Sequence, residues 1–184
     1  METADQSSIS PAFWSAVRAT ATEVRAAFLS MPDEPYRGAK GIFPQVWCEW
    51  ASIALAEVLA AHDLCEWTFV EMKLPDSLSG HSWIELRGDR STALFTIDIT
   101  LDQFPEWDDW HLGTAPTPAL SKFSRTGYMG PWRDWPAVAT NSSFAAYAEK
   151  MLRYVEQRRR PPNQVGQLHQ GVQRTLPSPS ECDP

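Results

Sequence analysis

The sequence has no excess of basic residues and no long apolar run, and each shortage excludes a class of protein. Sixteen Lys and Arg stand against 23 Asp and Glu, which leaves a formal net charge of −7 and disfavours a nucleic-acid partner. No apolar run reaches the roughly 18 residues of a membrane span. The acidic N-terminus lacks the pattern of a signal peptide. We therefore expect a cytoplasmic protein that binds neither nucleic acid nor membrane.

Cysteines are few, and the familiar ligand-binding motifs are missing. The three cysteines (48, 65 and 182) are an odd number without framework spacing. This favours free thiols in a reducing compartment over disulfides. Neither the C-x₂-C nor the H-x₃-H spacing of a zinc site occurs, and there is no Gly-rich phosphate-binding motif. The residues therefore favour neither a metal site nor a nucleotide cofactor.

Size and composition predict one folded domain with a tail. The 184 residues are 43% hydrophobic and include nine Trp, enough to form a core over residues 1–160. Residues 161–184 are rich in Pro, Gln and Ser and have little to bury, so we expect them to be disordered. No internal repeat is visible.

Hydrophobic periodicity predicts helices first and strands afterwards. Residues 101–140, rich in Trp and Pro, are expected to form an irregular segment with one short strand. A last helix is expected to be capped by Ser142 or Ser143. The other predicted elements are a helix over 11–29, a helix from Pro44 to about 61, and strands over 67–74, 81–86 and 93–100.

Three residues of this pattern suggest chemistry: Cys48 near a helix start, and His81 and Asp98 on adjacent strands. A thiol, an imidazole and a carboxylate can act as nucleophile, base and orienting group. Unsatisfied N–H groups and the helix dipole near the helix start favour a thiolate at Cys48. Asp is depleted in strands, so an Asp between two Ile calls for a polar partner.

The hairpin geometry predicts how His81 and Asp98 meet. A symmetric hairpin centred between Asp89 and Arg90 pairs residues whose numbers sum to 179, so His81 faces Asp98. Side chains alternate between the two faces of a sheet, which puts Trp83 on the same face. Opposed residues have Cβ atoms roughly 4.5–5.5 Å apart, close enough for a hydrogen bond.

These segments resemble the transglutaminase-like branch of the papain-like cysteine hydrolase superfamily. The pattern is a Cys at a helix start, then His81-Ser-Trp83 on a strand, then Asp98 on the next strand. The run Asp98-Ile-Thr-Leu-Asp-Gln-Phe104 is similar to a stretch in small bacterial members. The similarity covers about residues 41–104.

The resemblance implies an α+β fold in which the Cys helix packs on an antiparallel sheet. It also implies thiol acyl chemistry on the amides of a protein or peptide, without metal or cofactor. Gln45 and the Cys48 backbone N–H are candidate oxyanion donors. Trp47, Trp83 and Gln103 are expected to line the substrate cleft, although Gln103 could instead tie down the following loop.

Two further interpretations stay open. Trp47 and Trp50 flank Cys48 where small members often have a small residue before it, which favours a non-catalytic protein-binding module on the same fold. Its contact surface would be the acidic, Trp-rich segment 102–135. A third interpretation is an exported effector whose tail serves delivery. The substrate, the choice between hydrolysis and transfer, and the oligomeric state are left open by the sequence.

Overall fold

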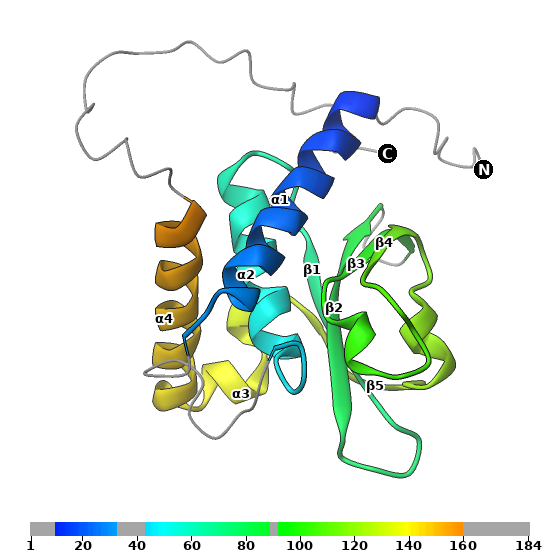
Figure 1. The fold of residues 1–184 in the computed structure, drawn as a ribbon. Coiled ribbons are helices and arrows are strands. Elements are labelled where there is room, and N and C mark those ends of the chain that lie inside the picture. The colour runs from blue at the N-terminus through cyan, green and yellow to red at the C-terminus, as the bar shows by residue number, and fades with distance from the viewer. Residues whose placement is uncertain (1–9, 33–42, 89–91, 160–184) are drawn as a thin grey trace, which may run out of the picture.

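The fold has helices on one face of an antiparallel sheet (Figure 1). The computed structural model describes residues 10–32, 43–88 and 92–159, so the predicted tail and Cys182 lie outside the described residues. The predicted α+β class is confirmed. Within the described ranges, no helix is long and apolar enough to cross a membrane.

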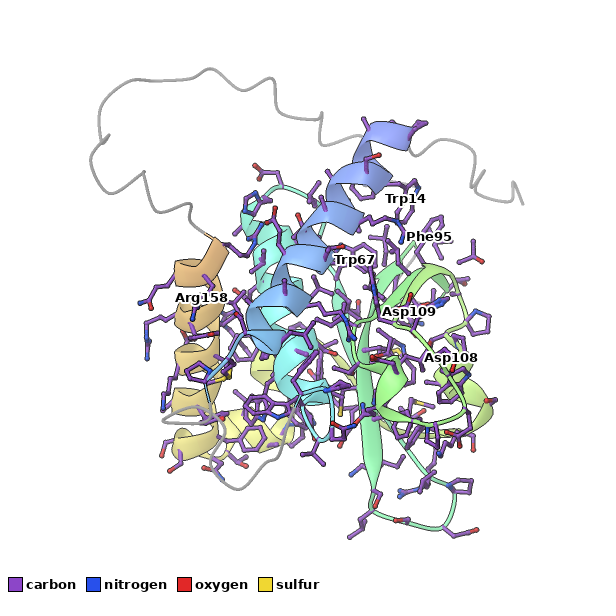
Figure 2. The ribbon with its side chains drawn as sticks, in the orientation of Figure 1. Trp14, Trp67, Phe95, Asp108, Asp109 and Arg158 are labelled. Atoms are coloured by element: carbon purple, nitrogen blue, oxygen red, sulfur yellow. The ribbon has the colours of Figure 1, made fainter. Side chains whose placement is uncertain are left out.

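Three long helices form the helical layer, and each contacts the other two. In α1, Ser10 accepts the N–H of Phe13 at 3.1 Å and Pro11 fills the first turn, as expected at a helix start. At the outer end of α1, Trp14 lies beside Phe95 of the sheet, with ring centroids 4.3 Å apart (Figure 2). The helices are α1 (Pro11–Leu29), α2 (Cys48–Ala61), the short α3 (Pro136–Ala139) and α4 (Ser142–Arg159).

Helix α2 is the central helix of this layer. Ten of its 14 residues are buried, because its sequence has an apolar residue on nearly every side. It packs on β2 and β1 of the sheet as well as on α1 and α4. The expectation that Pro44 lies in its first turn is wrong: Pro44 belongs to a turn over 43–46, and the helix begins at Cys48.

The sheet has five antiparallel strands in the order β4-β3-β2-β1-β5. One face, with Phe69, Ile84 and Ile97, joins the core of the helical layer. The other face carries a smaller apolar cluster that includes Val70 and Trp83. The strands are β1 (Thr68–Lys73), β2 (Gly80–Arg87), β3 (Ala93–Asp98), β4 (His111–Thr114) and β5 (Arg125–Gly130).

The chain between β3 and α4 is more regular than expected. It contains two strands rather than one, and both form edges of the sheet. Its Trp132 and Trp135 are buried in the main core, whereas Trp107 and Trp110 are half-buried. Besides α3 and loops, this part of the chain has three short 3₁₀ turns: η4 (Leu101–Gln103), η5 (Pro118–Ser121) and η6 (Trp132–Asp134).

The predicted register between β2 and β3 is wrong by two residues. Ile84 pairs with Ile97 and Glu85 with Thr96, so the paired numbers sum to 181 rather than 179. A bulge lies between Leu86 and Arg87, where the sum changes from 181 to 180. A shift of two keeps every side chain on its predicted face. His81 and Asp98 therefore share a face as expected, but as diagonal neighbours and not as an opposed pair.

Cys65 also departs from the sequence prediction. It is disulfide-bonded, so the expectation of a free thiol is wrong at this position. Among the described cysteines Cys48 alone is free. This finding weakens the reason for expecting a reducing compartment.

The N-terminus of α4 is capped one residue earlier than predicted. The Asn141 side-chain oxygen accepts the backbone N–H groups of Ser143 (3.1 Å) and Phe144 (3.2 Å). Asn is among the best N-cap residues because its oxygen satisfies otherwise unpaired N–H groups of the first turn. Ser142 is the first helical residue instead.

Replacing the cap tests this assignment. We expect Asn141→Ala to lower the free energy of unfolding by about 1 kcal/mol, because two N–H groups lose their acceptor. Ser142→Ala is the matched control and should change it by less than about 0.5 kcal/mol. Urea denaturation followed by circular dichroism measures both. A larger loss from Ser142→Ala would show that the serine is the cap.

Candidate active site

Three elements bring the predicted catalytic residues to one end of the sheet. Cys48 is the first residue of α2, His81 is the second residue of β2, and Asp98 is the last residue of β3. The β2–β3 ladder ends at the Ile84–Ile97 pair. The site therefore lies just beyond the point where the two strands stop pairing.

His81 and Asp98 form a buried hydrogen-bonded pair. His81 Nε2 lies 2.6 Å from Asp98 Oδ2, and both side chains are 0% exposed. The other carboxylate oxygen, Oδ1, accepts the backbone N–H and the hydroxyl of Thr100, each at 3.1 Å. Both carboxylate oxygens thus have partners, as a buried carboxylate requires.

The second ring nitrogen of His81 is bound by Gln103. The Gln103 side-chain amide lies 3.1 Å from His81 Nδ1 and donates to the Thr100 carbonyl at 3.0 Å. Aromatic rings enclose the imidazole: Phe104 at 4.9 Å and Phe123 at 5.4 Å between ring centroids. Hydrogen bonds and rings together fix the orientation of the imidazole.

The Cys48 thiol faces the backbone of β2. Cys48 and Ser52 are one helical turn apart, and both contact Ser82: Ser52 Oγ donates to its carbonyl at 3.1 Å, and the Ser82 backbone hydrogen-bonds to the thiol. The Cys48 Sγ itself lies 3.5 Å from Glu49 Oε2. Among the hydrogen bonds of the described residues, none joins Cys48 to His81.

The expectation of a thiolate at Cys48 is wrong for this arrangement. Cys48 is 4% exposed. Burial raises the pKa of its thiol well above the ordinary value, and the charge of Glu49 raises it further. The hydrogen bond from Ser82 lowers the pKa, but it does not offset these effects. The cysteine is therefore a neutral thiol near pH 7.

The side-chain amide that reaches the site belongs to Gln103 and not to Gln45. Gln45 is exposed, and within the described residues its side chain has no hydrogen bond to the site. Sequence reasoning missed the contact of Gln103 with His81. The signal was the Asp-Gln-Phe stretch, since a 3₁₀ turn directly after the strand points Gln103 back at the imidazole.

The tryptophans expected at the cleft are buried in this arrangement. Trp47 packs on Phe28 of α1, and Trp50 packs on Phe144 of α4. Both indoles therefore turn toward the helices while the thiol faces β2. Trp83 is 0% exposed and donates to Glu85 at 3.0 Å. Trp47, likewise 0% exposed, and Trp83 are thus closed to a ligand here.

His111 lies on the other side of Asp98, as its direct partner across the β3–β4 ladder. Burial lowers the pKa of His111, and the charge of Asp98 partly opposes this. Nε2 of His111 has no hydrogen-bond partner among the described residues. The Asp98 carboxylate is bonded to His81 and Thr100 instead.

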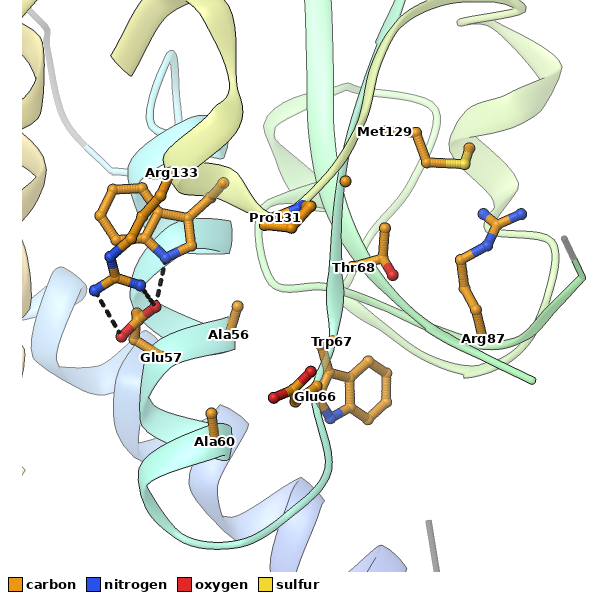
Figure 3. A pocket seen from close by; sticks show the side chains of 12 residues that line it. Ala56, Glu57, Ala60, Glu66, Trp67, Thr68, Arg87, Met129, Pro131 and Arg133 are labelled. Carbon is orange, nitrogen blue, oxygen red and sulfur yellow. Dashed lines mark hydrogen bonds and ion pairs between the residues drawn. The ribbon is translucent and has the colours of Figure 1, made fainter. Parts of the chain in front are cut away.

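A pocket of about 710 Å³ lies beside the C-terminal half of α2 (Figure 3). Burial tends to raise the pKa of Glu57 in this pocket, but hydrogen bonds from Arg133 and Trp132 hold it below its ordinary value. Glu57 is nine residues from Cys48, roughly 13 Å along the helix axis. The pocket is therefore separate from the thiol. It is lined by Ala56, Glu57, Ala60, Glu66, Trp67, Thr68, Arg87, Met129, Gly130, Pro131, Trp132 and Arg133.

Comparisons with known proteins add no family to this geometry. No protein-family model, no curated protein and no solved structure matches the chain. Among the residues that the structure describes, no group of three His, Cys, Asp or Glu is placed to hold a metal ion. The geometry of the site is thus the basis for any functional proposal.

Removing the charge of Glu49 tests its effect on the thiol. We expect Glu49→Gln to lower the pKa of Cys48, because the thiolate no longer forms beside a carboxylate. The pH profile of Cys48 alkylation by iodoacetamide should shift to lower pH. Glu156→Gln, at an exposed position of α4, is the matched control. An unchanged profile in Glu49→Gln would show that the charge of Glu49 does not hold the thiol neutral.

Proposed function

We propose that the protein is a cysteine-dependent amide hydrolase or acyltransferase of transglutaminase-like type. Cys48 is the nucleophile, His81 the base and Asp98 the residue that orients His81. The substrate is a protein or peptide amide, either a peptide bond or the side chain of glutamine. The single observation that carries this proposal is the buried His81–Asp98 pair at 2.6 Å, next to the cysteine at the start of α2.

The reaction follows from the roles of the three groups. Nδ1 of His81 takes the proton of the Cys48 thiol, while the Nε2 proton stays directed at Asp98. The thiolate attacks the amide carbonyl, the S–C bond forms, and the C–N bond breaks as His81 donates its proton to the leaving amine. Water or a second amine then breaks the thioester and releases Cys48.

Support for these roles comes from the hydrogen bonds around the imidazole. Asp98 accepts at Nε2, so the lone pair of the neutral ring is at Nδ1, where a base is needed. The first N–H groups of α2 have no partner within the helix and are suited to stabilise the oxyanion. If the His81–Asp98 pair had only a structural role, no cysteine would be needed at the start of α2.

Peptide turnover tests the proposal. Glutamine-containing peptides should release ammonia or incorporate a primary amine, and mass spectrometry should find an acyl group on Cys48. Cys48→Ala should abolish turnover. Asp98→Asn should lower kcat by about 10²- to 10⁴-fold, because an amide holds the wrong tautomer of His81. Asp76→Asn, at an exposed position of the turn before β2, is the matched control.

The thiol mechanism is wrong if Cys48→Ala keeps its turnover, or if Asp98→Asn is as active as Asp76→Asn. Thermal unfolding of each variant separates a loss of chemistry from a loss of fold. A peptide in which an ester replaces the scissile amide has a better leaving group. Turnover of the ester but not of the amide would show that loss of the leaving group, and not attack by Cys48, limits the reaction.

A second function, a protein-binding module on the same fold, is favoured by the burial of Cys48 and His81. Segment 102–135 would be its contact surface. Two indoles of that segment are buried and two are half-buried. Acids such as Asp108 and Asp109 are exposed on the side of the sheet opposite α4 (Figure 2). This function predicts no acyl-enzyme with any peptide. It also predicts that charge reversal at Asp108 and Asp109, and not Cys48→Ala, abolishes partner binding.

A further inference from the structure

Gln103 connects the two halves of the site. Its Oε1 accepts the backbone N–H of Val46 at 3.3 Å, two residues before Cys48, and its amide nitrogen lies 3.1 Å from Nδ1 of His81. The same nitrogen donates to the Thr100 carbonyl at 3.0 Å. One side chain thus holds the turn before the cysteine and the ring of the histidine together.

The orientation of this amide is fixed by its backbone partners. A backbone N–H can only donate and a backbone carbonyl can only accept, so the oxygen must face Val46 and the nitrogen must face Thr100. The nitrogen therefore donates to Nδ1 of His81. Nδ1 carries the lone pair, and the ring proton is on Nε2, directed at Asp98.

That lone pair is the one that Cys48 needs. Nδ1 of a neutral imidazole has a single in-plane lone pair, so it accepts from the amide or from the thiol, but not from both. In the structure the lone pair of Nδ1 accepts from the Gln103 amide, and the thiol contacts Glu49 and Ser82 instead.

The turn before Cys48 is held in a strained conformation. Val46 has φ 56°, a left-handed conformation that is unfavourable for a β-branched residue. Such strain persists only where neighbouring contacts enforce it, and it is frequent at functional sites. The hydrogen bond from the Val46 N–H to Gln103 is one such contact, whereas the residue as a whole is 56% exposed.

The backbone beneath Gln103 is anchored, which leaves its side chain as the part that can move. Its neighbour Asp102 makes two hydrogen bonds with the guanidinium of Arg25 on α1, at 2.6 and 3.1 Å. Arg25 also donates to the carbonyl of Ile99. Turn η4 is thus tied to α1 on both sides of Leu101.

We propose that Gln103 is a latch: its amide competes with the Cys48 thiol for Nδ1 of His81 and keeps the site at rest until substrate displaces it. The inference rests on the proposed function, since a latch on Nδ1 has meaning only if His81 is the base. Displacement frees the lone pair for the thiol and releases the strained turn at Val46 in the same step.

Alkylation of Cys48 in the full chain tests the latch without any substrate. Gln103→Met keeps the length of the side chain but cannot donate a hydrogen bond. We expect it to raise the rate of Cys48 alkylation by iodoacetamide at pH 7 by about tenfold or more, since each unit of lowered thiol pKa gives about tenfold more thiolate. Gln157→Met, at an exposed position of α4, should leave the rate unchanged.

Adding His81→Gln to Gln103→Met should remove the gain, because the activated thiol then has no imidazole. The ¹⁵N shift of His81 Nδ1 gives an independent readout without a second substitution: it should change in Gln103→Met, where this nitrogen loses the amide donor, and stay at the parent value in Gln157→Met. If Gln103→Met does not fold, Gln103→Ala takes its place in both measurements.

An alkylation rate equal to that of the parent overturns the latch. A gain that persists in the absence of His81 also overturns it, because Gln103 would then merely shield the thiol.

Peptide turnover separates the two proposals. Fast alkylation in Gln103→Met with no turnover by any variant contradicts the proposed function alone, whereas turnover by the parent with no gain in Gln103→Met contradicts the latch alone.

Discussion

The hydrogen bond between His81 and Asp98 is the interaction around which this end of the molecule is organised. Two ionisable side chains that are completely buried are costly unless each polar atom has a partner. Thr100 and Gln103, both from the turn that follows β3, provide the remaining partners. The turn after β3 is therefore part of the site and not a mere connection, and its sequence is constrained by the pair that it completes.

Helix α2 places the cysteine against this pair by contacts that have little to do with reactivity. Its apolar surface is buried on nearly every side. Trp47, just before the helix, packs on α1, and Trp50 within it packs on α4. The small side chains of Cys48 and Ser52 both contact the backbone of Ser82. Small residues on one side and large ones on the other thus bring the thiol close to the backbone of β2, at the cost of burying it.

Periodicity was sufficient to predict the coarse fold. The helix over 11–29, the first three strands and the shared face of His81 and Asp98 follow from spacings of 3.6 and 2 residues. The strands at 111–114 and 125–130 were not resolved by this reasoning, because they are short, contain Gly and have few apolar residues to set a period. The α4 cap was missed because Asn and Ser at adjacent positions are nearly equivalent by sequence.

The surroundings of the site residues were harder to predict than the identity of those residues. The state of Cys48 depends on burial and on Glu49, whereas the sequence pattern pointed to the free N–H groups and the dipole of the helix start. The role of Gln103 depends on a side chain reaching a ring 22 residues earlier in the chain. Such contacts are set by the tertiary arrangement, which no local spacing encodes.

The bulge beside Leu86 has a consequence for how this hairpin can vary. On the loop side of the bulge, Arg87 pairs with Ala93, and continuing that pairing would set Asp98 opposite Ser82, among the apolar side chains beneath α2. One surplus residue in β3 turns the carboxylate through the sheet to the histidine. Insertions and deletions within either strand of the hairpin are thus constrained by parity. An odd one without a compensating bulge puts the acid and the imidazole on opposite faces of the sheet, whereas an even one keeps them on the same face.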